Sequence, residues 1–263
     1  MINGLLHALI LDEQGGARPI ENSKQLHQWQ PTDGKLWVHM DYSQKEAVDW
    51  LKNCGQLNDY ELESLTADET RPRITPTMNG HMLFLRGINL NPAQSPEDMV
   101  SIRLFINKDV VITTRKRRLL SVQDILTSLN NNEGPSSISE LVCSLAQKLT
   151  SRMQTVIDEL DESLDDFEEE IDEPSKKFDN QGLSQLRRQT IALKRYLKPQ
   201  KEALSNMVNN HYPWLFDDDK AKLNETTNLL IRYLEELDSS IERALVIQQT
   251  ITNQVSEQLN QRM

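Results

Sequence analysis

Residues 137–173 read SISELVCSLAQKLTSRMQTVIDELDESLDDFEEEIDE. Their apolar residues recur at steps of three and four, the pattern of a helix that packs one face against other helices. Ser137 is suited to start this helix and Pro174 to stop it. At about 1.5 Å per residue, the helix would be about 55 Å long. The stretch therefore predicts that long, coiled-coil-like helices build the second half of the chain.

Two further helices are predicted after this stretch. One carries apolar residues from Leu183 to Met207, and Pro199 would kink it or end its first half. The other begins near the acids Asp217–Asp219 and continues to the end of the sequence, over about 70 Å. Helices of this length must protrude from a compact domain, pack against copies of themselves or lead into another structure. The last helix shows no Gly or Pro stop over residues 258–263, so we expect the chain to continue.

The composition changes near residue 136. Eight of the nine glycines and seven of the ten prolines lie in residues 1–136, and turn-forming residues over 130–135 mark the change. Residues 1–136 carry 14 basic and 17 acidic side chains, whereas residues 137–263 carry 15 and 23. We therefore predict a regulatory head domain over 1–136 and a long-helix stalk, or funnel, over 137–263.

The first region shows β-rich runs separated by turns, which predict a mixed, mainly antiparallel sheet with flanking helices, and hence an α+β fold. Asn79-Gly80 is a strong hairpin signal, and Lys108-Asp109 is expected to join another strand pair. The predicted strands are Leu5–Leu11, Lys35–Met40, Arg73–Met78, His81–Leu90, Val100–Asn107 and Val110–Thr114. Ser43 is predicted to cap a helix that runs to about Asn53, with Glu46 completing a capping box. Asp59 is predicted to cap a second, short helix, and a third is predicted from Leu119 to Leu129.

Composition argues against several functions. Forty acidic against 29 basic residues give a net charge of −11, which disfavours nucleic-acid binding. Cys54 and Cys143 are too few for a disulfide framework or a cysteine-based zinc site. No window approaches 18 consecutive apolar residues, so no membrane-spanning segment is predicted. The sequence contains no phosphate-binding glycine loop, nucleophile elbow or HExxH motif, and we expect no enzyme and no tightly bound cofactor.

Metal binding has only weak candidates. Residues 158–173 hold eleven acids in sixteen positions, among them Asp165, Asp166 and Glu169. They could concentrate cations, but charge runs usually form a solvated helix face. The histidines show no i, i+3 or i+4 pair, and His211 with Asp217 at a bend between helices is the best placed.

Basic residues gather in two stretches. Arg115, Lys116, Arg117 and Arg118 precede a predicted helix and could bind an anion or repel cations, or simply pair with acidic helices. The basic residues between 187 and 201 are expected to face the acidic helix over 137–173.

Several motifs carry a resemblance to a known family. They are LRGINLNP at 85–92, PEDMVSIRL at 96–104, TTRKRR at 113–118, VQDI at 122–125, LDESLDD at 160–166 and QLNQRM at 258–263. On these residues the sequence resembles the cytoplasmic part of the ZntB family, a zinc-transporting branch of the CorA metal-ion transporter superfamily. The resemblance implies a funnel-shaped homopentamer, attached to its own transmembrane helices in a bacterial inner membrane. It also implies Zn²⁺ as the transported ion, with proton coupling.

Two alternatives stay open at this point. A magnesium or cobalt transporter of the CorA type would share these motifs, because the residues that select the ion lie in the membrane part. A soluble coiled-coil scaffold with an α/β head would share the helical pattern. Two apolar runs of about 20 residues beyond Met263 would support the transporter.

Overall fold

A single seven-stranded sheet forms the centre of the first region in the computed structural model, which describes residues 2–172 and 178–262. Its order is β2-β1-β3-β7-β6-β5-β4. The central pair, β3 and β7, is parallel, and every other neighbouring pair is antiparallel. The strands are β1 Leu5–Leu11, β2 Ala17–Pro19, β3 Leu36–Asp41, β4 Arg73–Pro76, β5 His81–Gly87, β6 Val100–Ile106 and β7 Val110–Arg115. The prediction of a mixed, mainly antiparallel sheet is confirmed.

The sheet is covered on both faces, because its strands alternate between two hydrophobic cores. On β5, Leu83 and Leu85 belong to the core that includes the long helices, whereas Met82 and Phe84 belong to the core on the opposite face. All seven residues of β6 are buried, as expected for a strand with neighbours on both sides.

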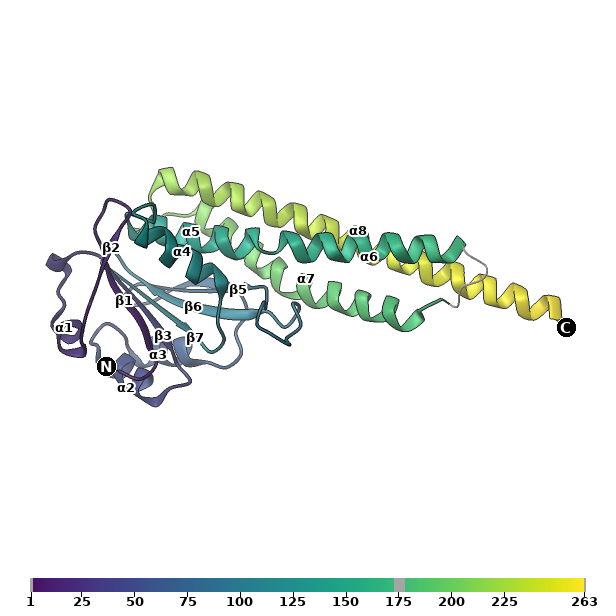
Figure 1. Cartoon of the computed structure of the whole chain (residues 1–263). Helices are drawn as coiled ribbons and strands as arrows, with labels where there is room; N and C mark the ends of the chain where they lie inside the picture. Colours follow the sequence, from purple (N-terminus) through teal and green to yellow (C-terminus); the bar gives the residue numbers. More distant parts are fainter. Residues whose placement is uncertain (1, 173–177, 263) are drawn as a thin grey trace.

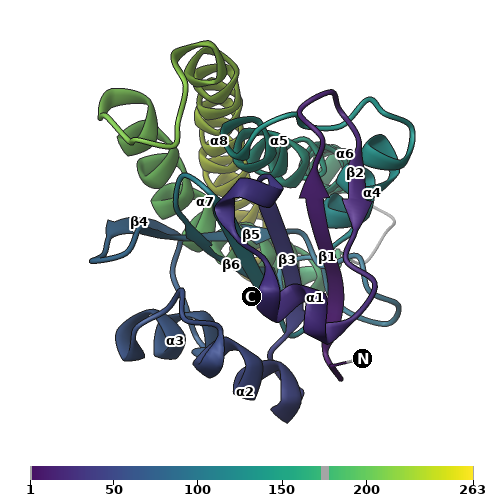
Figure 2. The ribbon, with the colours of Figure 1, turned by 90° about the vertical axis from the view of Figure 1, so that its left-hand side faces the viewer.

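Short helices cover one face. They are α1 Ser23–Gln28, α2 Lys45–Asn53 and α3 Asp59–Thr66, and Figure 2 shows α2 and α3 side by side below the sheet. The predicted helix starts were wrong by one position each. Gln44 is the N-cap of α2, while the Ser43 hydroxyl donates to Asp41 instead. Asn58, not Asp59, caps α3, and it forms a capping box with Glu61.

The long helices cover the other face and extend well beyond it (Figure 1). They are α5 Ile138–Ser151, α6 Gln154–Asp172, α7 Asn180–Asn209 and α8 Asp217–Arg262, and the shorter α4, Leu120–Asn130, precedes them. The 46 residues of α8 make it about 70 Å long at 1.5 Å per residue. The hydrophobic core on this face continues from the sheet along these helices to Ile251.

The predicted single helix over 137–173 is in fact two helices. Ser137 caps α5 as predicted, but that helix ends at Ser151 and α6 begins at Gln154. The Arg152 guanidinium donates two hydrogen bonds to Asp124 of α4, at 2.7 and 2.8 Å, where the helix breaks. The predicted stop at Pro174 lies outside the described residues. Pro199, in contrast, lies inside a continuous α7 and does not end it.

Candidate functional site: charged contacts along the long helices

Helix α8 contacts α5, α6 and α7 along its length, and charged side chains mark these contacts. Figure 1 shows α8 running from above the sheet to the far tip of the molecule, where the C-terminus lies. A motion of the sheet relative to that tip must therefore pass through α8 and its partners. Three charged contacts hold α8, one near its start, one in its middle and one beside α6.

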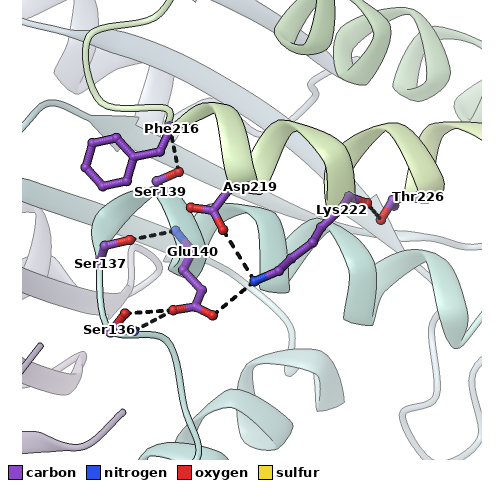
Figure 3. A network of polar contacts seen from close by, with 8 residues as sticks. All are labelled: Ser136, Ser137, Ser139, Glu140, Phe216, Asp219, Lys222 and Thr226. Atoms are coloured by element: carbon purple, nitrogen blue, oxygen red, sulfur yellow. Dashed lines mark hydrogen bonds and ion pairs between the residues drawn. The ribbon is translucent and has the colours of Figure 1, made fainter. Parts of the chain in front are cut away.

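The contact near its start is the network in Figure 3. Lys222 Nζ lies 3.3 Å from Glu140 Oε1 of α5 and 3.5 Å from Asp219 Oδ1 of its own helix. Glu140 also accepts hydrogen bonds from the backbone N–H and the hydroxyl of Ser136, both at 2.9 Å. Ser139 Oγ accepts a hydrogen bond from the backbone N–H of Phe216. The first turns of α5 and α8 are thus joined by both charged and neutral contacts.

The ionisation of this network follows from its contacts. Burial raises the pKa of Glu140, but the hydrogen bonds from Ser136 and Lys222 outweigh burial, so the pKa is lowered overall. Hydrogen bonding to Glu140 raises the pKa of Lys222. Both groups are therefore charged at neutral pH, and their attraction holds α8 against α5.

The middle contact is an ion pair between Lys194 of α7 and Asp238 of α8. The basic stretch over 187–201 was expected to face the acidic helix. Lys194 instead pairs with α8, and Arg195 lines a cavity beside the sheet. The basic residues of this stretch have different surroundings, because successive side chains on α7 point in different directions around the helix.

The third contact joins Arg243 of α8 to three carboxylates of α6. Arg243 Nη1 lies 2.6 Å from Asp161 Oδ1, Nη2 bonds to Asp165, and Nε lies 2.8 Å from Glu168 Oε1. Hydrogen bonding to Arg243 lowers the pKa of Glu168. One guanidinium thus pairs with three of the eleven acidic residues over 158–173 and offsets one unit of their charge.

The predicted metal candidates lie in separate places. Asp165 is bound to Arg243, while Asp166 and Glu169 are exposed on α6. His211 and Asp217 are exposed on the two sides of the connection from α7 to α8. Within residues 2–172 and 178–262, no group of three or more His, Cys, Asp or Glu side chains is placed to hold a metal ion. Metal binding at these residues stays a prediction.

The predicted anion candidates lie at the end of β7 and in the loop before α4. Burial lowers the pKa of Arg115, whose side chain is half-buried. Lys116 Nζ lies 2.9 Å from Asp68 Oδ1, so this residue pairs with the loop after α3 rather than with a long helix. Arg117 and Arg118 are exposed.

Neither Arg243 nor Lys222 is predicted from the sequence as a functional residue, although both hold α8 to its neighbours. A signal existed for Arg243, since it is the one basic residue between positions 233 and 261 of an otherwise acidic and neutral helix. Its partners lie at least 75 positions earlier in the chain, so the sequence does not reveal them.

The comparisons with known proteins agree on one family. Its description is "CorA-like Mg2+ transporter protein", and it matches residues 33–263. The zinc transport protein ZntB of Pectobacterium carotovorum subsp. carotovorum (strain PC1) is 34% identical over 261 residues, which are 99% of this chain and 78% of that protein. The divalent cation transporter CmaX of Pseudomonas aeruginosa is 36% identical over 262 residues, 99% of this chain and 79% of that one.

Solved structures show the same fold. The full-length CmaX protein superposes with a TM-score of 0.92 at 37% identity, over 99% of this chain and 80% of that one. The ZntB cytoplasmic domain from Vibrio parahaemolyticus gives a TM-score of 0.84 at 23% identity, over 97% of this chain and 99% of that one. Across the described residues, no helix is long and apolar enough to cross a membrane. By sequence and by fold, the chain belongs to the CorA-like family of metal-ion transporter proteins.

Proposed function

We propose that the chain is the cytoplasmic part of a zinc transporter in a bacterial inner membrane. The observation that carries the proposal is the 34% identity to a zinc transport protein over 99% of the chain. The chain contributes no catalysis and no tightly bound cofactor, and zinc is its transported ion.

In this proposal the protein works as a homopentamer whose long helices lead to the membrane. Residues 1–136 form a regulatory head, and residues 137–263 form the stalk that surrounds the ion path. Rigid helices can bias a pore between two states when one end moves. The three charged contacts of α8 support this role, because they join α8 to α5, α6 and α7.

The charged surfaces have proposed roles in the same transporter. Asp165, Asp166 and Glu169 raise the local cation concentration along the stalk, with His211 and Asp217 as a second weak cation contact. The positive charge of the stretch Arg115, Lys116, Arg117 and Arg118 keeps cations off the head.

A second candidate is a transporter of other divalent cations, such as magnesium or cobalt. Two observations favour it, namely the family description, which names Mg²⁺, and the 36% identity to the divalent cation transporter CmaX. The zinc and magnesium functions differ in the ion carried and share the mechanism of the cytoplasmic part.

One experiment separates the candidates. The transporter, with its membrane helices, is reconstituted in proteoliposomes that contain a zinc-sensitive or magnesium-sensitive dye, with and without a pH gradient. Zinc uptake that is faster than magnesium and cobalt uptake supports the first proposal, and acceleration by the gradient supports proton coupling. Magnesium or cobalt uptake without zinc uptake supports the second. Native mass spectrometry of the reconstituted protein tests the pentamer.

A further inference from the structure

A basic cavity lies beside the sheet, away from the contacts between the long helices. It is an open hollow lined by residues of β5 and β6, of the segment after β7 and of the loop between α3 and β4, and its volume is about 310 Å³. Four cationic side chains line it, whereas Asp68 is its single carboxylate. The four cations are Arg86, Arg103, Lys116 and Arg117.

Arg103 is the buried centre of this cavity. Its side chain comes from β6, is 1% exposed, and lies with its guanidinium 4.7 Å from the ring of Tyr42. Its Nη2 donates to the backbone carbonyls of Ala67 and Asp68. Its Nε is buried and has no hydrogen-bond partner among the residues that the structure describes. A buried charged donor without a hydrogen-bond partner lowers the stability of the folded state. Arg103 Nε is therefore available to donate a hydrogen bond to a bound ligand.

Arg86 is the second half-buried guanidinium of the cavity. It donates to the carbonyl oxygens of Met99 and Thr70, both at 2.8 Å, and stacks on the ring of Tyr196 at 4.0 Å. Burial lowers the pKa of Arg86 and of Arg103, because a buried guanidinium loses its hydration. Within residues 2–172 and 178–262, neither arginine forms an ion pair with a carboxylate.

The remaining charges leave the cavity with a cationic surplus. Asp68 is engaged by Lys116, with 2.9 Å between Nζ and Oδ1. Arg117 is exposed at the cavity mouth, and no described carboxylate pairs with it. The unpartnered Nε of Arg103 and the exposed guanidinium of Arg117 match the oxygens of a phosphate group, which takes two or more charge-assisted hydrogen bonds at once.

We propose that this cavity binds the phosphate group of a small phosphorylated molecule, held by Arg103, Arg86 and Arg117. A larger cavity of about 810 Å³ adjoins it and shares Asp68, Arg86, Met99 and Arg117 with it. The larger cavity also contains Arg71, Arg195 and acidic side chains, so it has room and polar partners for the rest of the molecule. The site is independent of which ion the transporter carries.

The test is calorimetric titration of the whole chain with inorganic pyrophosphate and with ATP, at constant ionic strength set with chloride. Constant ionic strength removes general screening effects from the comparison. We expect saturable binding at one site per chain. Loss of one arginine–phosphate contact in Arg117→Gln is expected to weaken binding about tenfold.

Arg118→Gln is the matched control, because Arg118 is the exposed neighbour of Arg117 and lines neither cavity. It removes the same charge, and its binding should stay within about twofold of the unchanged chain. Arg103→Lys keeps the positive charge but removes the Nε donor, and it should weaken pyrophosphate and ATP binding. Adding Arg118→Gln to this variant should weaken binding no further. If circular dichroism shows that Arg103→Lys is unfolded, the proposal is tested by comparing the affinities of Arg117→Gln and Arg118→Gln.

Three results would overturn the proposal. One is the lack of any saturable heat with pyrophosphate and ATP. Another is equal weakening by Arg117→Gln and Arg118→Gln, which would mean general electrostatic attraction. The third is equal or tighter binding of citrate, which would assign the cavity to carboxylates instead of phosphates.

Discussion

Arg243 of α8 lies 2.6 Å from Asp161 of α6, measured between Nη1 and Oδ1. The same guanidinium reaches Asp165 and Glu168, so a single cation holds three carboxylates on successive turns of a neighbouring helix. These carboxylates repel one another along α6, and Arg243 offsets that repulsion. This contact ties the acidic helix α6 to α8.

Replacing Arg243 with glutamine is therefore expected to lower the free energy of unfolding by about 1–2 kcal/mol, since each partly exposed ion pair contributes up to about 1 kcal/mol. The variant should also gain stability from added Zn²⁺ or Mg²⁺, which would replace the lost positive charge. Urea unfolding with and without the metal measures both effects. Arg232→Gln is the control, because Arg232 lies on the same helix and contacts Glu236 alone, at 3.7 Å, among its described acidic neighbours. An equal metal response in the two variants would contradict the prediction.

The contribution of Arg243 should depend on pH. Its hydrogen bonds lower the pKa of Glu168 below the ordinary value of 4.5. A carboxylate with a lowered pKa in the folded state stabilises fully above its unfolded value, and this stabilisation is lost as the pH falls through the folded value. The stability difference between the unchanged chain and Arg243→Gln should stay constant from neutral pH down to about pH 5 and narrow below pH 4.5. Urea titrations across this range measure it, and a difference that widens on acidification would refute it.

Lys222 is expected to matter more than its position on an exposed helix suggests. In Lys222→Met, Asp219, whose side chain is 9% exposed, loses a cationic partner, and Glu140 loses its link to α8. The loss should cost about 2 kcal/mol, in the range for a partly buried charge left without its partner. Thermal unfolding measures it. Lys220→Met is the matched control, because its partner Asp217 is 96% exposed, and the change should stay within about 0.5 kcal/mol. Equal losses in both variants would show that burial of Asp219 is unimportant.

Gly80 should not tolerate a side chain. A Cβ there would lie 2.4 Å from the backbone oxygen of Ile106, closer than any real contact. Gly80→Ala should therefore cost about 1–3 kcal/mol, as overpacking against a rigid strand does. Met78→Ala in the same turn is the control, since Met78 is 90% exposed. Chemical denaturation of both variants tests this, and an unaffected Gly80→Ala would mean that the β4–β5 turn can shift.

Cys143 can report on separation of α5 from α8. Burial, with a smaller contribution from the charge of Asp219 of α8, raises the pKa of this thiol to about 12. Thiolate, not thiol, reacts with iodoacetamide, so Cys143 should stay unlabelled at neutral pH while α8 covers it. Labelling of a Cys54→Ser chain, followed by mass spectrometry, measures this rate, and Lys222→Met should increase it. If Cys143 of the folded Cys54→Ser chain were labelled as fast as in denaturant, the prediction would be contradicted.

Local patterns were enough to predict most of the elements. Asn79-Gly80 predicted the hairpin of β4 and β5, and Thr77 and Gly80 do close that turn. The hairpin signal assumes a glycine with positive φ, whereas Gly80 is not among the glycines with positive φ and is needed for its close approach to Ile106. A propensity rule can thus locate a turn correctly without identifying the contact that requires its glycine.

The helix break at Arg152 shows where local patterns fail. No Gly or Pro lies between Ser137 and Arg152, and the apolar spacing continues across the break. Arg152 donates paired hydrogen bonds to Asp124, which lies 28 positions earlier in the chain and on another helix. Tertiary contacts of this kind override helix propensity, which amounts to only a few tenths of a kcal/mol per residue.

The sequence by itself determined the α+β class, the approximate strands, the long apolar helix faces and the family. Hydrophobic spacing and turn residues act between near neighbours in the chain, so their effects can be predicted from one sequence. Only the tertiary structure decided the parallel pairing of β3 with β7, the three partners of Arg243 and the convergence of Arg86, Arg103 and Arg117 on one cavity. These contacts join residues tens of positions apart, and their partners are chosen by the packing of whole elements rather than by any local pattern.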